Sequence, residues 1–252
     1  MRIRATVAVL SGALALSALA VPAAFADESS GDTQLTKVAA NGGASIAVGI
    51  GKKTFSYSVT ATDSSGIADA EAFLWHGTSV NSPDGATADG GTSSCTSAGT
   101  CTFNGTIDPS SDGLLNSTAG TWNVFAGVDA KDGDYVVKDA AATVKLLRIS
   151  KLTADAGPEP VKKGKTLTVT GKLTRADWQA LKYVGYNSKT VSLQFRPAGS
   201  STYTTVKSVT TGTGGALKTT VTASKDGYWR FSFAGSSTTA SSKATGDYVD
   251  VQ

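Results

Sequence analysis

The stretch Asp226-Gly227-Tyr228-Trp229-Arg230-Phe231-Ser232-Phe233-Ala234-Gly235 decides the fold class of this chain. It opens with an Asp-Gly turn pair and then alternates between large apolar and polar side chains. Trp229, Phe231 and Phe233 fall on one face of an extended strand, and Tyr228 and Arg230 fall on the other. A period of two over this length predicts a β-strand with one face on a core and one in solvent.

Short strands and turns of this kind recur along the whole chain. Asp-Gly, a strong hairpin-turn signal, occurs five times. The pairs start at Asp84, Asp89, Asp112, Asp132 and Asp226. The spacing of the apolar runs predicts an all-β protein with two Ig-like antiparallel β-sandwiches in tandem after a signal peptide.

Charge divides the chain near residue 149. Residues 27–148 hold 14 acids and 7 bases, whereas residues 149–252 hold 6 acids and 14 bases. Such asymmetry favours two domains, and the length suits two domains of about 100–150 residues each. We therefore expect a disordered N-terminus over 27–33, an acidic Ig-like sandwich over 34–149 and a basic one over 150–252.

Residues 1–26 have the pattern of a signal peptide. Arg2 and Arg4 precede an uncharged, Ala-rich run, and the small residues Ala24 and Ala26 stand at −3 and −1 of the expected cleavage site. The run is too short and too weakly apolar to span a bilayer. The sequence thus predicts a secreted protein, extracellular or associated with the cell wall, with no membrane span in the mature chain. Export argues against nucleic acid as a partner.

Cys95 and Cys101 are the two cysteines of the chain. Two close cysteines in an exported protein predict a disulfide. The chain-entropy model gives so short a loop only ~2–2.5 kcal/mol of stabilisation. We expect the bridge to pin the long loop 77–101 rather than to hold the fold, and a loop of that length is commonly functional or mobile.

Two resemblances accompany these patterns. Val59-Thr-Ala-Thr-Asp-Ser-Ser-Gly-Ile67 is similar to a corner between two strands of bacterial Ig-like and cadherin-like modules. The second half resembles a module of uncharacterised secreted actinobacterial proteins over roughly residues 150–252. The segments that carry this second resemblance are 165–173, 182–186, 191–196, 228–235 and 246–250. It implies an Ig-like fold and export, and it brings no chemistry or ligand.

The strands of the second half are interrupted at residues 175–183. Trp178 and Leu181 stand three residues apart there, as on one face of a helix. This spacing predicts one short helix in the second domain, capping an end of the sandwich.

Catalytic residues are sparse. His76 is the one histidine, it reads as the end of a strand, and no Gly-x-Ser-x-Gly elbow is present. We expect a non-catalytic extracellular or cell-envelope module, for binding or for structure. The alternatives are a calcium-binding secreted protein, a secreted hydrolase, or a protease inhibitor that presents loop 77–101.

Calcium is the favoured ion because Asp129, Asp132 and Asp134 place three carboxylates within six residues, with Asp63 and Asp69 as further candidates. The spacing does not match an EF-hand, and a solvated Asp-Gly hairpin is the simpler explanation. No other cofactor is expected.

A binding face is expected on the basic half. Arg196, Tyr228, Arg230 and Tyr248 occupy outward positions of strands that neighbour one another in an Ig-type sheet. Arg and Tyr are common at binding surfaces, so a cell-wall polymer or a protein is a candidate partner. The alternative is an internal ion pair between Arg230 and Asp250.

Overall fold

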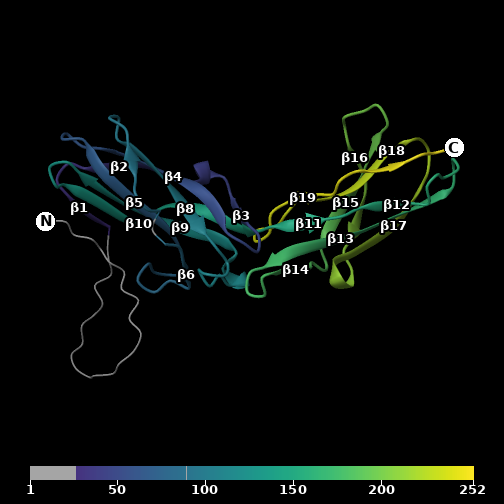
Figure 1. Ribbon diagram of the computed structural model, residues 1–252, viewed down its shortest axis with the longest axis horizontal. Helices are drawn as coiled ribbons and strands as arrows, with labels where there is room; N and C mark the ends of the chain where they lie inside the picture. The colour runs from purple at the N-terminus through teal and green to yellow at the C-terminus, as the bar shows by residue number, and fades with distance from the viewer. Residues whose placement is uncertain (1–26, 89) are drawn as a thin grey trace, which may run out of the picture.

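The structure is a computed structural model that describes residues 27–88 and 90–252, and the expected signal peptide with Ala24 and Ala26 lies outside the described residues. The described chain is all-β and elongated, with the N-terminal half at one end and the C-terminal half at the other (Figure 1). Three 3-10 turns accompany the strands: η1 (Asn41–Gly43), η2 (Asn116–Thr118) and η3 (Thr213–Gly215).

In the residues that the structure describes, the first half contains ten strands. They are β1 (Glu28–Ser30), β2 (Gln34–Ala40), β3 (Ile46–Val48), β4 (Lys53–Thr62), β5 (Ile67–His76), β6 (Gly85–Ala86), β7 (Ser94–Cys95), β8 (Thr100–Ile107), β9 (Gly120–Ala130) and β10 (Tyr135–Arg148). One sheet has the order β2-β4-β8-β7, and the other has the order β1-β10-β9-β5-β6, with β3 parallel to β10. Taken in chain order from β2, these strands form the A-B-E-D and G-F-C-C′ sheets of an Ig-like sandwich.

Alternation along β4 shows how this core is built. Phe55, Tyr57, Val59 and Ala61 are all buried, and the residues between them are more exposed. The alternation extends along Lys53–Thr62. Trp122 of β9 lies in the same core, is fully buried, and donates a hydrogen bond from its indole to the Thr118 carbonyl at 2.7 Å.

The second half contains the remaining ten strands. They are β11 (Ser150–Leu152), β12 (Asp155–Gly157), β13 (Thr166–Asp177), β14 (Lys182–Gly185), β15 (Thr190–Pro197), β16 (Thr204–Thr210), β17 (Ala216–Thr222), β18 (Gly227–Phe233), β19 (Ser242–Lys243) and β20 (Asp247–Val249). β11, β12, β14 and β17 all pair with β13, and the facing sheet has the order β16-β15-β18 with β19 and β20 on the outer side of β18. The two layers correspond to A-B-E and C′-C-F-G.

Strand β18 covers the alternating stretch Gly227–Phe233. Trp229, Phe231 and Phe233 are 7%, 0% and 4% exposed, and the residues between them are half-buried. The alternation therefore predicted both the strand and its inward face correctly.

Two expectations are wrong. Residues 27–33 are not wholly disordered, because Glu28–Ser30 form β1 and pair with Tyr135–Val137 of β10. The helix expected at residues 175–183 is absent: β13 runs on to Asp177, the chain turns, and Lys182 begins β14. The spacing of Trp178 and Leu181 arises from the turn of this hairpin rather than from a helical face.

The β13–β14 hairpin joins the two halves. Its turn residue Trp178 is 1% exposed and packs in the core of the first sandwich, although it belongs to a strand pair of the second. The Trp178 indole donates to the Val48 carbonyl at 3.2 Å. Asn116, in η2, donates to the Asp177 carboxylate at 2.8 Å and accepts from the Trp178 backbone N–H at 3.0 Å.

The chain crossing between the halves is also paired. Arg148, the last residue of β10, exchanges backbone hydrogen bonds with residues 238 and 240 of the second half at 3.1 and 2.9 Å. Its side chain is 4% exposed and donates from Nε to the Ala176 carbonyl. Burial, followed by the nearby charge of Arg175, lowers the pKa of Arg148. The halves therefore meet through ordered contacts as well as through the connecting chain.

Replacing Trp178 by alanine should destabilise the protein by about 3–5 kcal/mol, because the change empties a large site in a close-packed core. Chemical denaturation should show this loss in the free energy of unfolding. Small-angle scattering should show a molecule that is less extended than the wild type or more variable in its dimensions. Leu181→Ala is the matched control from the same turn, where the side chain is 42% exposed, and it should change stability by less than about 0.5 kcal/mol. Equal effects of the two changes would contradict the assigned role of Trp178.

Candidate functional site

The outward face of the β16-β15-β18-β20 sheet gathers the residues expected to bind a partner. Strand register places Arg196 opposite Tyr228, Tyr228 opposite Tyr248, and Arg230 opposite Gln194. Residues directly opposite each other in an antiparallel pair share a face. All four sequence-predicted residues, Arg196, Tyr228, Arg230 and Tyr248, therefore lie together on this face.

These side chains form a continuous stack, which we call the Arg–Tyr ladder: Tyr248, Tyr228, Arg196, Tyr203 and Arg230. The Tyr248 and Tyr228 rings meet edge to face, with centroids 5.1 Å apart. The Arg196 guanidinium carbon lies 3.8 Å from the Tyr228 centroid and 5.2 Å from that of Tyr203. The Arg230 carbon lies 3.6 Å from the Tyr203 centroid. Each such cation–π contact contributes roughly 0.5–1 kcal/mol at an exposed site.

In the part of the chain that the structure describes, neither arginine is paired with a carboxylate. The ion pairs among residues 27–88 and 90–252 are His76–Asp84 and Lys138–Asp27, both in the first half. Arg196 donates to the Ser200 carbonyl at 2.6 Å, and Arg230 donates from Nε to the Gln194 side-chain oxygen at 2.9 Å. Hydrogen bonding to Tyr203 raises the pKa of Arg196 above its ordinary value. The ladder thus holds two fixed positive charges at any physiological pH.

The alternative pair of Arg230 with Asp250 is wrong. Register places Val249 opposite Gly227, so Asp250 lies beyond the end of the ladder, and its carboxylate accepts from Gln252 instead. Tyr203 was missed by the sequence analysis because it lies just outside a strand, in the segment between β15 and β16. Its place between two arginines depends on how that segment folds back, and no local pattern signals it.

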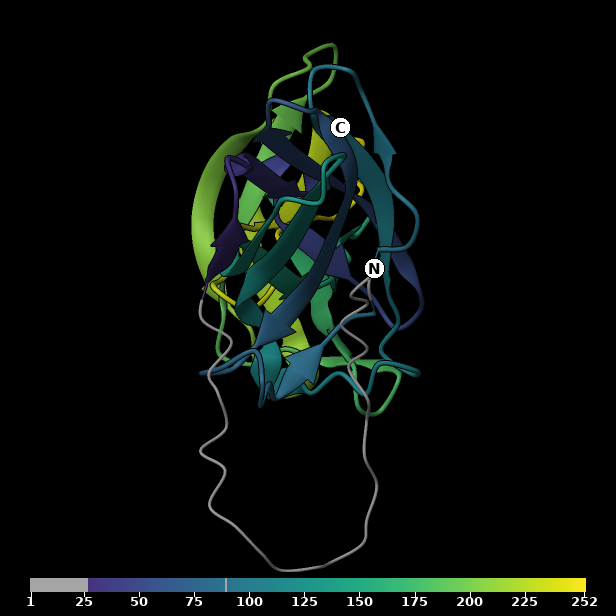
Figure 2. The same cartoon turned by 90° about the vertical axis from the view of Figure 1, so that its left-hand side faces the viewer.

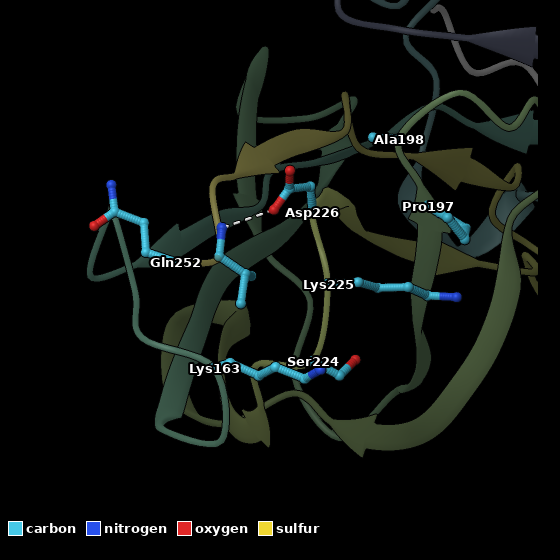
Figure 3. A pocket seen from close by; sticks show the side chains of 8 residues that line it. Lys163, Pro197, Ala198, Ser224, Lys225, Asp226 and Gln252 are labelled. Carbon is cyan, nitrogen blue, oxygen red and sulfur yellow. Dashed lines mark hydrogen bonds between the residues drawn. The ribbon is translucent and has the colours of Figure 1, made fainter.

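A shallow hollow of about 430 Å³ lies at the tip beyond the ladder. Lys163, Lys225 and Asp226 line it together with the C-terminal residues (Figure 3). The Asp226 carboxylate accepts from the Val251 backbone N–H at 2.9 Å, so this acid is already engaged. The hollow adds two lysines to the charge at this end of the molecule.

A second group of charged residues lies at the opposite tip, which Figure 2 views end on. Oxygen atoms of Asp32, Asp63, Asp132 and Asp134 all lie within 4.8 Å of one another. The four aspartates come from three turns: β1–β2, β4–β5 and β9–β10. We call this group the acidic tip.

The candidate calcium ligands are only partly brought together. Asp132 and Asp134 belong to the acidic tip, as does Asp63, while Asp32 was not foreseen. Asp129 is not in the group: it stands on β9 opposite Asp69 of β5. Burial first, and the Asp69 charge second, raise the pKa of Asp129.

Hydrogen bonds arrange the acidic tip. Asp63 accepts from the Ser65 N–H and hydroxyl at 2.7 and 2.6 Å, and from the Thr33 hydroxyl at 2.6 Å. These bonds, that of the Ser65 hydroxyl foremost, lower the pKa of Asp63 to about 2. The Asp134 carboxylate accepts from the Asp32 backbone N–H at 3.1 Å. It also lies directly against Gly31, where a Cβ atom would overlap it.

The predicted disulfide is confirmed. Cys95 and Cys101 stand opposite each other on β7 and β8, with sulfur atoms 2.04 Å apart. Within loop 77–101, β6 pairs with β5. His76, at the end of β5, contacts Asp84 at 2.5 Å and lies 5.5 Å from the Trp122 ring. Neither contact supplies a nucleophile.

Comparison with known proteins finds no family model and no curated protein that matches the chain. Solved structures do match. The fibronectin(III)-like modules of Clostridium thermocellum CbhA are 13% identical over 85% of this chain and 93% of theirs, with a TM-score of 0.38. The Escherichia coli adhesin FdeC is 15% identical over 87% of this chain and 66% of its own, with a TM-score of 0.36. The D00-D0 domain of intimin is 13% identical over 84% of this chain and 99% of its own, with a TM-score of 0.29.

In the described residues, no helix has the length and apolar character needed to cross a membrane.

The depressed pKa of Asp63 gives the acidic tip a pH signature. The ordinary value is 3.8 and the folded value is about 2. The ionised carboxylate therefore favours the folded state above pH 3.8, and this contribution is lost as the pH falls towards 2. Asp63→Asn should make stability less dependent on pH in that window, as measured by denaturation at each pH. An unchanged slope in Asp63→Asn would contradict the assignment.

Proposed function

We propose that this chain is a secreted, non-catalytic protein of two Ig-like domains, and that it binds an extracellular partner through the Arg–Tyr ladder. The stacked arrangement of Arg196 and Arg230 carries the proposal. Both cations lie on the outward face of a sheet, both are half-buried, and neither is neutralised by an acid. Arg and Tyr are the residue types that carry most energy at binding surfaces.

The ladder is suited to binding because it is ordered before a partner arrives. Each arginine is held by a ring on one side and by a hydrogen bond at its edge. A side chain that is already fixed loses less conformational entropy when it binds, which otherwise costs about 0.5–1.5 kcal/mol for each long side chain. The rigid sheet beneath it, built on Trp229 and Phe231, keeps the spacing of the ladder constant.

Export is supported by three observations of different kinds. The first 26 residues have the pattern of a signal peptide. The disulfide suits an oxidising compartment. The second half resembles modules of secreted actinobacterial proteins. A cell-wall polymer or a cell-surface protein is therefore the partner class that we propose, and neither the hydrolase nor the inhibitor alternative has an observation in its favour.

Retention on purified cell wall tests this function. Arg196→Ala with Arg230→Ala should lower retention at least about tenfold, because two charged contacts are lost at once. Lys172→Ala with Lys218→Ala removes the same charge from exposed positions of the opposite sheet, and it should retain binding. Arg196→Lys with Arg230→Lys keeps the positive charge but loses the planar groups that stack on the rings. Its retention should lie between that of the wild type and that of the double alanine variant. Equal retention by the wild type and the double alanine variant would refute the proposed face.

Calcium binding at the acidic tip is the second candidate, and the convergence of four carboxylates favours it. Ca²⁺ takes six to eight oxygen ligands, and turns with several carboxylates supply them. Millimolar calcium should then raise the melting temperature by a few degrees over the value with chelator. Asp132→Asn with Asp134→Asn should abolish that rise, whereas Asp129→Asn should keep it. A melting temperature that calcium does not move would rule this candidate out.

A further inference from the structure

The positive charge of the ladder continues beyond the four residues that the sequence singled out. Register places Lys243 of β19 directly opposite Ser232 of β18. Ser232 stands between the buried Phe231 and Phe233, so it faces outward, and its cross-strand partner shares that face. Lys243 is exposed. A third cation therefore follows Arg196 and Arg230 on the same side of the sheet.

Other outward positions along this line carry no negative charge. On β15 and β18 they are Ser192, Gln194 and Ser232, all neutral. The aspartate nearest to Lys243 in sequence is Asp247. It stands opposite the buried Trp229, and its carboxylate accepts from the Ala156 backbone N–H. Asp226 and Asp250 lie past the Gly227–Val249 pair, beyond the Tyr228–Tyr248 end of the face. The face thus has a tyrosine end and a cationic run, which we call the cationic track, that leads from Arg196 through Arg230 to Lys243.

The track is linear and has a definite length. It follows β18 from Tyr228 to Ser232, four residue steps, which is about 13 Å at the rise of a β-strand. Spaced cations along a line match a chain that carries regularly repeated negative charges. Arginine guanidinium groups fit carboxylate and phosphate oxygens in a bidentate manner. The exposed ring of Tyr248 offers apolar surface for the less polar face of a sugar.

We propose that the partner of this face is a linear acidic polymer, in particular a polysaccharide whose sugars carry carboxylates, bound along β18 with its oxyanions on Arg196, Arg230 and Lys243. This inference rests on the proposed function and names the ligand class of the same face. The net positive charge of residues 149–252 favours the approach of such a polymer. Because the track is exposed, the interaction weakens as salt screens it.

Defined polymers test the ligand class with the full chain. Polygalacturonate oligomers carry a carboxylate on each sugar, and their fully methyl-esterified form has the same ring without the charge. We expect the protein to bind polygalacturonate and to show no measurable binding to the methyl-esterified form. The affinity for polygalacturonate should fall steeply between about 50 and 300 mM salt, because salt shortens the Debye length. Inorganic polyphosphate forms a third arm: binding to polyphosphate without binding to polygalacturonate would overturn the assignment of a carboxylated polysaccharide.

Variants locate the site. Lys243→Ala should weaken binding to polygalacturonate about five- to tenfold, the effect of one charged contact. Lys218→Ala, an exposed lysine on the opposite sheet, is the matched control and should bind as the wild type does. A melting curve for each variant separates lost binding from lost folding.

The outcomes separate this inference from the proposed function. If wall retention depends on Arg196 and Arg230 while the esterified polymer binds as well as the acid, or neither anionic polymer binds, the acidic-polymer inference fails and the binding face stands. If Lys243→Ala and Lys218→Ala weaken binding equally, the track is wrong and the attraction is one of net charge only. If the double arginine variant is retained on the wall as the wild type is, both proposals fail.

Discussion

The indole of Trp178 leaves its own sandwich and ends in the core of the other. It is carried there by an extension of β13 past the edge of the second domain, and it is held by packing and by one hydrogen bond to Val48. Two Ig-like domains joined by a short chain segment alone would move independently. Here the inserted ring and the buried Arg148 hold one half of the chain against the other. The turns that carry the acidic tip and the strands that carry the Arg–Tyr ladder therefore stay in opposite halves of the molecule (Figure 1).

This constraint also shapes the electrostatics. The acidic half and the basic half do not pack face to face. Such packing would neutralise their charges. Each charged surface stays exposed to solvent, and each has its own hydrogen-bonded arrangement: Ser65 and Thr33 around Asp63, and Tyr203 between Arg196 and Arg230. Like charges held together at a surface lower stability slightly, and an outside partner of opposite charge relieves that repulsion.

Much of the fold is predictable from local alternation. The strands at Lys53–Thr62 and Gly227–Phe233 follow from a period of two, because one face of each is buried and the other is not. β2 escaped notice because its pairing with β4 shifts register between Leu35 and Lys37, which breaks the alternation. The hairpin at Trp178 was taken for a helix because a tight turn and a helix both place residues three apart on one side.

The binding face was predictable in part for the same reason. Once the strand order of an Ig fold is assumed, alternation fixes which positions of neighbouring strands face outward. On this basis the sequence predicts one shared face for Arg196, Tyr228, Arg230 and Tyr248. The place of Lys243 depends on long-range register, and that of Tyr203 depends on how the segment between β15 and β16 folds back. The meeting of Asp32 with Asp63 depends on the packing of separate turns. Such residues become visible only when the chain is folded, because nothing in their immediate sequence marks them.

The most direct measurement uses the arginine side chains themselves. Residues 27–252 contain four arginines, two in the ladder and two, Arg148 and Arg175, at the junction between domains. Nuclear magnetic resonance resolves an Nε–H signal from each while polygalacturonate is added. The account predicts that the signals of Arg196 and Arg230 move with saturation while those of Arg148 and Arg175 stay in place. Movement of the junction pair alone, or of none of the four, would contradict it.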